Sequence, residues 1–255
     1  MPDRDLLIRA AREGGHIALT FWKRDPQVWE KSGDLGPVTE ADLAVNAALE
    51  RILRGARPDY GWLSEESADD PTRLTADRVF IVDPIDGTRS FIAGEDTFAV
   101  SLAVAERGEI VAAAVYLPAL DRMYAADATG AIRDGQPIQA SGRTGIKDAS
   151  LLATRANLLP EHWPGGVPEL KRSFRSSIAF RMCLVAEGRH DGMLSLRDSF
   201  EWDIAAGDLI ARRAGATVTD RHGAALVFNR PQPWAAGILA AAPGLHDALL
   251  ERLVP

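Results

Sequence analysis

The sequence is poor in cysteine and has no long apolar segment. Cys183 is the only cysteine among 255 residues, so a disulfide framework is excluded and we expect a reducing compartment, the cytoplasm. The longest uncharged runs, residues 110–120 and 231–245, contain proline or glycine and are shorter than the ~20 apolar residues of a membrane span. We therefore expect no membrane association. Because the first residues mix charges into a helical pattern, we also expect no secretion signal.

Basic residues are outnumbered by acidic ones. The chain has 29 Lys and Arg residues against 36 Asp and Glu residues, and its formal net charge is -7. Such a balance disfavours binding to a nucleic-acid polymer, and an anionic substrate would need basic groups close to its site. With 255 residues, of which 46% are hydrophobic, the chain is long enough for one large globular domain or two small ones.

A buried strand leads directly into an acidic loop at residues 79–90. Residues 79–82 are apolar, and Asp83 and Asp86 follow them, which is typical of a strand that ends at a polar site. Pro84 cannot donate a ladder hydrogen bond, so the strand pairing should be interrupted there. Gly87 then permits a tight turn, after which a short helix should begin near Arg89.

This loop combines groups that bind anions with groups that bind cations. The amides of Gly87 and Thr88 would form an anion site at the start of the helix, while Asp83 and Asp86 supply oxygens close by. A divalent cation reconciles the two, because Mg²⁺ accepts carboxylate oxygens on one side and phosphate oxygens on the other. The alternative is an Asx turn that closes the strand.

Two amphipathic helices should precede this loop. Apolar residues recur at steps of three and four between residues 6 and 21, which predicts a helix that ends before Asp25. Thr39 and Asp42 fit a capping box that begins a second helix, ending near Arg57. A role as a helix cap is therefore a sufficient structural explanation for Asp42.

Further strands should build an antiparallel sheet. One candidate, residues 60–64, ends at Glu65 and Glu66, whose side chains point to opposite faces if the backbone stays extended. An antiparallel meander is expected from residues 98–105, 110–116 and 122–126. The polar stretch 128–148 follows. We place a boundary there, between an N-terminal α+β half, residues 1–143, and a C-terminal α/β half, residues 144–255.

Strands and helices alternate in the C-terminal half, which indicates an α/β layer. The expected strands are residues 150–153, 193–196 and 216–219, and the expected helices are residues 178–187 and 204–214. Asp203 stands just before the second of these helices. A carboxylate is favoured there by the helix dipole, so a helix cap is again the structural alternative.

Four motifs together resemble the inositol monophosphatase superfamily. They are LSEES at 63–67, DPIDGT at 83–88, WDIAAGDLIARRAGA at 202–216, and Lys31 followed by VTEAD at 38–42. The resemblance runs from about residue 5 to the end. It implies a five-layer αβαβα sandwich, with an antiparallel N-terminal sheet, a mixed α/β C-terminal half and the site between them.

The resemblance also implies a phosphatase site with two to three Mg²⁺ ions. Glu65, Asp83 and the carbonyl of Ile85 would hold the first ion, Asp83, Asp86 and Asp203 the second, and Glu65 a weaker third. Two such ions would neutralise the charge of a phosphate monoester and of the leaving alkoxide. Inhibition by Li⁺ at the second position is implied as well.

Other site residues follow from the same resemblance. Asp42 and Thr88, with Glu65, would form the catalytic group that orients and deprotonates the attacking water, and the amides of Gly87 and Thr88 would hold the phosphate. Glu66 would lie behind the metal ligands, and Lys31 is a possible substrate contact. A homodimer is also implied.

The substrate is predicted from two segments. Residues 177–188 and the segment FIAGEDTFAVSLAV resemble CysQ-type 3′(2′),5′-bisphosphate nucleotidases, and Arg181 lies near a lysine of that pattern, where it could meet a second phosphate or face solvent as an ordinary helix arginine. Inositol phosphatases usually place a glutamate several residues before the Trp-Asp pair, whereas here Glu201 directly precedes Trp202.

The main hypothesis is therefore a Mg²⁺-dependent phosphomonoesterase that converts adenosine 3′,5′-bisphosphate to AMP and phosphate. Inositol-1-monophosphatase and histidinol-phosphate phosphatase are the alternatives. A regulatory or RNA-associated binding protein is the alternative without catalysis. A glycosidase built on Asp83 and Asp86 is disfavoured by the phosphate-binding amides and by the lack of an aromatic-rich cleft.

Overall fold

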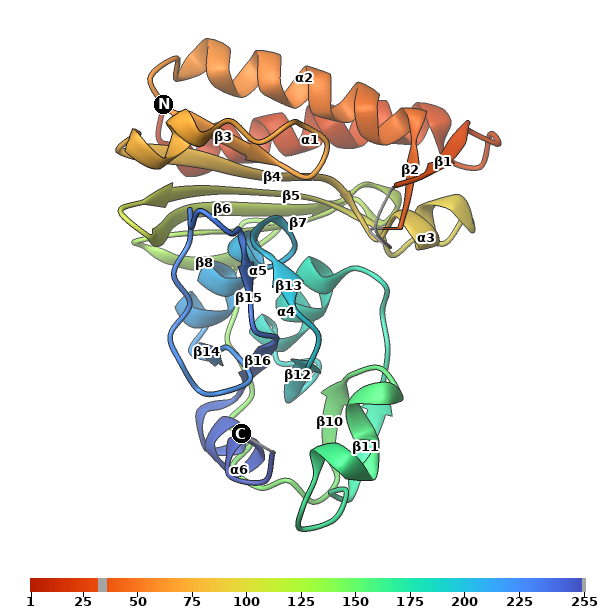
Figure 1. The fold of residues 1–255 in the computed structure, drawn as a ribbon, viewed down its shortest axis with the longest axis vertical. Coiled ribbons are helices and arrows are strands. Elements are labelled where there is room, and N and C mark those ends of the chain that lie inside the picture. The colour runs from red at the N-terminus through yellow and green to blue at the C-terminus, as the bar shows by residue number, and fades with distance from the viewer. Residues whose placement is uncertain (32–35, 254–255) are drawn as a thin grey trace.

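The chain folds into five stacked layers of helices and sheets, α, β, α, β and α (Figure 1). The computed structural model describes residues 1–31 and 36–253. The outer layer consists of α1 (Asp3–Phe21) and α2 (Glu40–Ala56). Both helices were expected. Their apolar faces, with residues such as Leu7 and Leu49, are fully buried against the first sheet.

The second layer is a seven-stranded sheet whose strands follow chain order. Its strands are β3 (Gly61–Ser64), β4 (Arg78–Asp86), β5 (Ala99–Glu106), β6 (Glu109–Leu117), β7 (Arg122–Asp127), β8 (Gly130–Arg133) and β9 (Gln136–Pro137). The predicted meander is confirmed as β5 to β7, while β3 and β4 pair in parallel. The sheet continues through β8 and β9 into the stretch that was expected to be a polar connection. The sequence did not predict these two strands, because they are short, are joined by turns that contain glycine, and carry no long apolar pattern.

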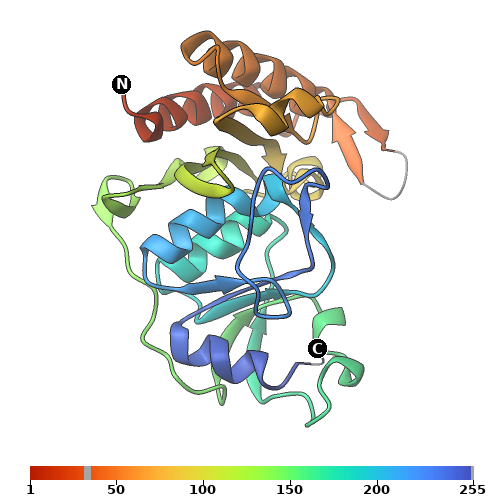
Figure 2. The same ribbon diagram turned by 60° about the vertical axis from the view of Figure 1, so that its left-hand side comes forward.

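The third layer contains α4 (Ile178–Ala186) and α5 (Glu201–Arg213), which lie between the two sheets (Figures 1 and 2). Every residue of α4 is buried, as its apolar sequence requires in this central position. One apolar cluster joins these helices to the sheets on both sides. The short helix α3 (Thr88–Ile92) follows β4 at the edge of this layer.

The fourth layer is a mixed five-stranded sheet in the order β11-β10-β12-β16-β14. Its strands are β10 (Ala149–Leu152), β11 (Leu170–Ser173), β12 (Gly192–Ser195), β14 (Thr217–Thr219) and β16 (Ile238–Ala241). The strand β10 pairs in parallel with both neighbours, and β16 is antiparallel to both of its own. The outer helix α6 (Pro243–Leu250) covers the far face.

The remaining strands form two small pairs, β1 (Val28–Glu30) with β2 (Pro37–Thr39) and β13 (Ser199–Phe200) with β15 (Trp234–Ala235). Four short 3-10 helices complete the described elements: η1 (Pro71–Thr75), η2 (Pro118–Leu120), η3 (Ala156–Leu158) and η4 (Pro160–His162). Among the described helices, none combines the length and the apolarity that crossing a bilayer requires.

The boundary between residues 143 and 144 stays a prediction. The first sheet ends at Pro137 and the second begins at Ala149, so the predicted position falls in the connection between them. The large apolar cluster includes residues from both halves.

Candidate active site

The acidic loop lies where β4 ends, beside the first turns of α4 and α5. The pairing of β4 with β5 is interrupted between Asp83 and Asp86, as expected at Pro84, and the strand then resumes for one residue opposite Ala99. Gly87 adopts a φ of 95°, a left-handed conformation that favours glycine. The chain thereby turns into α3, which begins at Thr88.

Three carboxylates from separate elements converge beside this loop. Glu65 follows β3, Asp83 belongs to β4 and Asp203 lies in the first turn of α5, and each offers an oxygen within 4.8 Å of the others. Asp83 is buried, with 1% of its surface exposed, and the other two are partly buried. Burial raises the pKa of Asp83 well above its usual range, and the charges of Glu65, Asp86 and Asp203 add to this effect.

This group fits a hard divalent cation. An all-oxygen set of carboxylates is the donor chemistry that Mg²⁺ selects. Burying several like charges together is unfavourable unless a cation neutralises them. Asp203 is not the N-cap of α5, because the helix begins at Glu201, but it lies in the first turn, where the helix dipole favours a carboxylate. It also faces the other two carboxylates, so the structural explanation and the metal-ligand explanation are both compatible with its position.

Asp86 is held by the N-terminus of α4. Its carboxylate accepts hydrogen bonds from the hydroxyl of Ser177 at 2.6 Å, the amide of Ala179 at 2.6 Å and the amide of Ile178 at 3.2 Å. Burial raises the pKa of Asp86 to about 6, although these hydrogen bonds oppose the rise. The bonds fasten the acidic loop of the N-terminal half to a helix of the C-terminal half.

Asp42 and Thr88 meet across the site. One oxygen of Asp42 accepts the amide of Thr39 at 2.8 Å and its hydroxyl at 2.6 Å, which completes the predicted capping box. The other oxygen accepts the hydroxyl of Thr88 at 3.5 Å, and that hydroxyl lies 3.1 Å from the carbonyl of Ile85. The cap and the contact with Thr88 are therefore both present. Burial raises the pKa of Asp42 to about 6.

Lys31 bridges the two adjacent glutamates. Its ammonium lies 2.7 Å from Glu65 and 2.5 Å from Glu66. Burial lowers the pKa of Lys31, but the charges and hydrogen bonds of the two glutamates outweigh burial and raise it overall. Burial also raises the pKa of Glu66 to about 7, against the effect of Lys31. Lys31 thus contacts carboxylates around the site, and its predicted contact with substrate stays a prediction.

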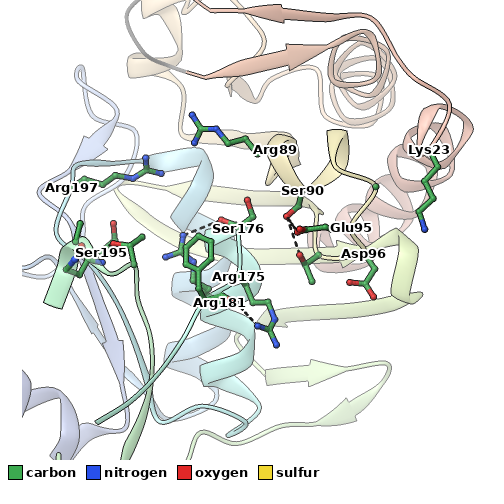
Figure 3. Close-up of a pocket in the computed structure, with 16 residues that line it drawn as sticks. Lys23, Arg89, Ser90, Glu95, Asp96, Arg175, Ser176, Arg181, Ser195 and Arg197 are labelled. Carbon is green, nitrogen blue, oxygen red and sulfur yellow. Dashed lines mark hydrogen bonds between the residues drawn. The ribbon is translucent and has the colours of Figure 1, made fainter. Parts of the chain in front are cut away.

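Two cavities adjoin at this site. The smaller cavity has a volume of about 260 Å³. It is lined by the carboxylates expected to bind metal and by the loop that follows them: Glu65, Asp83, Asp86, Asp203, Ile85, Gly87 and Thr88. The larger, of about 1120 Å³, contains Arg181 in its wall (Figure 3). Arg89, Ser176 and Arg197 line both, so the cavities are neighbours along these residues.

The structure excludes one of the two predicted environments of Arg181, and its contact with a second phosphate stays a prediction. Arg181 is not a solvent-facing helix residue, because only 3% of its surface is exposed. The sequence alone did not assign Arg89, Arg175 or Arg197 to the site. These arginines come from three separate loops or helix ends, so no local spacing identifies them as neighbours.

The chain is similar to several known proteins. A model of the inositol monophosphatase family matches residues 2–255. The chain is 32% identical to a "Fructose-1,6-bisphosphatase/inositol-1-monophosphatase" of Thermotoga maritima, over 86% of this chain and 85% of that protein. It is 36% identical to an "Inositol-1-monophosphatase" of Rhizobium meliloti, over 73% of each chain.

A solved structure shows the same fold. The extragenic suppressor protein suhB from Bartonella henselae superimposes with a TM-score of 0.84 at 28% identity, over 97% of this chain and 96% of that one. The fold and the acidic site are those of a metal-dependent phosphatase that acts on small phosphorylated compounds. The chain belongs to the inositol monophosphatase family.

Proposed function

We propose that this protein is a Mg²⁺-dependent phosphomonoesterase whose site is built by Asp42, Glu65, Asp83, Ile85, Asp86, Gly87, Thr88 and Asp203. The observation that carries the proposal is the convergence of Glu65, Asp83 and Asp203 within 4.8 Å, beside a loop suited to phosphate. Bound Mg²⁺ would supply positive charge to the phosphate and to the leaving oxygen.

The chain's own residues would divide the remaining work. Thr88 and Asp42 would hold the attacking water, because the hydroxyl of Thr88 lies 3.5 Å from a carboxylate oxygen of Asp42. A carboxylate with a pKa raised to about 6 can accept a proton near neutral pH. The amides of Gly87 and Thr88 would hold the phosphate, since Gly87 turns the backbone there.

Inositol-1-phosphate is the first candidate substrate, because both relatives described above carry inositol-1-monophosphatase in their names. The first name also includes fructose-1,6-bisphosphate. Adenosine 3′,5′-bisphosphate is the second candidate, supported by the position of Arg181 in the wall of the adjoining cavity. The regulatory alternative is less well supported, because the four carboxylates expected to hold metal, Glu65, Asp83, Asp86 and Asp203, all line the smaller cavity.

Two further properties belong to the same proposal. We expect Li⁺ to inhibit by occupying the position formed by Asp83, Asp86 and Asp203, because it fits a carboxylate site but carries half the charge of Mg²⁺. We also expect a homodimer that functions without a membrane or a nucleic-acid partner.

A substrate panel tests the proposal. Phosphate release should be measured for inositol-1-phosphate, adenosine 3′,5′-bisphosphate, histidinol phosphate and fructose-1,6-bisphosphate, each with Mg²⁺ and with EDTA. Release that requires Mg²⁺ on at least one compound is the expected result. No release from any of them would contradict the proposed activity.

A further inference from the structure

Four arginines face the large cavity beside the acidic site. Arg89, Arg175, Arg181 and Arg197 all line it, and Figure 3 shows them coming from separate segments. Within residues 1–31 and 36–253, none of the four forms an ion pair with a carboxylate. The cavity therefore gathers four guanidinium groups without a direct ion pair in a protein whose overall charge is negative, and Asp86 and Asp203 are near enough to Arg181 to offset a part of its charge.

Arg181 makes this arrangement costly in the absence of a ligand. It is 3% exposed, and its guanidinium has only long contacts to protein oxygens, 3.4 Å to the carbonyl of Ser177 and 3.3 Å to the carbonyl of Ser176. A buried guanidinium is favourable only when an anion or strong acceptors compensate it. Its contact with the ring of Phe174, at 5.3 Å, supplies a part of that compensation.

The carboxylates of the cavity lie apart from the arginines. Glu95 and Asp96 are on the side contributed by the N-terminal half, next to Lys23 (Figure 3). Glu95 accepts the hydroxyl of Ser90 at 2.6 Å. An anion could thus bind among the arginines without displacing an internal ion pair.

The two cavities are neighbours, so the position of one relative to the other suits a single extended ligand. Arg89, Ser176 and Arg197 line both, so these three residues lie within reach of a molecule whose phosphate is at the carboxylates and of a group in the arginine-lined cavity. A neutral polyol would leave the arginines there unpaired. A guanidinium binds a phosphate or a carboxylate by paired, charge-assisted hydrogen bonds.

We propose that the substrate is a phosphomonoester with a second anionic group, a phosphate or a carboxylate, which Arg175 and Arg181 bind together with Arg89 and Arg197. The inference rests on the proposed phosphatase function and narrows its substrate class. It favours a doubly anionic ester over inositol-1-phosphate.

Matched substrate pairs test the inference and distinguish the two kinds of anion. One pair is adenosine 3′-phosphate and adenosine 3′,5′-bisphosphate, which differ by a phosphate. The other is glycerol 2-phosphate and 2-phosphoglycerate, which differ by a carboxylate. In at least one pair, kcat/KM with Mg²⁺ should be tenfold or more higher for the member with the second anion.

Arginine variants test where the advantage arises. Arg181→Gln and Arg175→Gln should each reduce the ratio of kcat/KM within that pair severalfold. Arg175 is only partly buried, so its variant remains informative if Arg181→Gln fails to fold. Arg51→Gln, an exposed arginine on α2, is the matched control and should keep the wild-type ratio.

The possible outcomes separate the inference from the proposed function. Equal kcat/KM within both pairs, or an unchanged ratio in both folded arginine variants, would overturn the inference while the phosphatase function stands. No phosphate release from any compound would overturn the phosphatase function and this inference together.

Discussion

Asp42 shows how one side chain can satisfy both a structural and a chemical explanation. Sequence patterns predicted a capping box, and the family resemblance implied a role with Thr88. The structure assigns one carboxylate oxygen to Thr39 and the other to Thr88. A helix cap therefore fixes the orientation of a carboxylate that faces the site.

This arrangement predicts the behaviour of two alanine variants. Thr88→Ala and Asp42→Ala should each lower kcat by about 100-fold or more and change KM little, because water activation contributes mainly in the transition state. The double variant should be hardly worse than either single one. Losses that multiply in the double variant would show that the two residues act independently.

Thermal unfolding provides the control for the same variants. Asp42→Ala should also lower the free energy of unfolding by up to about 1 kcal/mol, because the amide and hydroxyl of the N-cap residue, Thr39, lose their acceptor in the capping box. Thr88→Ala removes no cap bond and should leave the melting temperature nearly unchanged. Equal destabilisation by both would contradict the separate roles of the two Asp42 oxygens.

At the scale of elements, the turn after β4 positions the site. An added Cβ at Gly87 would lie 3.2 Å from the amide nitrogen of Ser177 and 3.3 Å from its Cβ. Ser177 in turn donates to Asp86 from the start of α4. The close approach of Gly87 and Ser177 therefore joins β4, α3 and α4 at the carboxylates.

Gly87→Ala should impair both stability and activity. Gly135, which has a φ of 80° and no atom within 4 Å of an added Cβ, is the matched control. Gly135→Ala should lower the free energy of unfolding by only about 1 kcal/mol, the strain of an alanine in the left-handed conformation. Gly87→Ala should lower the free energy of unfolding, measured by chemical denaturation, by more than Gly135→Ala does. It should also lower kcat/KM at least tenfold, since Ser177 and Asp86 must shift. Similar effects of both variants on activity would contradict this account of the junction.

The elements were largely predictable, whereas the second cavity was not. The period of apolar residues identified both N-terminal helices, the meander and the alternation in the C-terminal half, because burial of one face imposes that period. The acidic site was predictable because its residues lie in three short motifs. The arginine-lined cavity depends on the packing of α3, α4 and the loops near Arg175 and Arg197, and local sequence does not encode that juxtaposition.

At the scale of the whole molecule, crowded carboxylates oppose folding until a cation binds. Burial, with the charge of neighbouring carboxylates, raises the pKa of Asp83 and Asp203 well above the usual range. In the unfolded chain these groups titrate near pH 4, as ordinary aspartates do. An acid whose pKa is raised by folding destabilises the fold as pH rises from the unfolded pKa through the folded one.

The metal-free protein should therefore lose stability at this site as pH rises above about 4, the pKa of an unfolded aspartate. Asp203→Asn removes one of the crowded charges, so its melting temperature in EDTA should exceed that of the wild type by a margin that grows with pH. Saturating Mg²⁺ should reverse the order, because the variant lacks a ligand. A margin that is constant with pH would contradict the crowding argument.

Phosphate release by the wild type and by Asp203→Asn, measured as Mg²⁺ is added to protein treated with EDTA, tests the central claim most directly. The wild type should be inactive in EDTA and should gain activity saturably with Mg²⁺. Asp203→Asn should stay at least 100-fold slower at every Mg²⁺ concentration while remaining folded. Release that is as fast in EDTA as in Mg²⁺, or near-wild-type turnover by Asp203→Asn, would contradict the assignment of these carboxylates as the catalytic metal site.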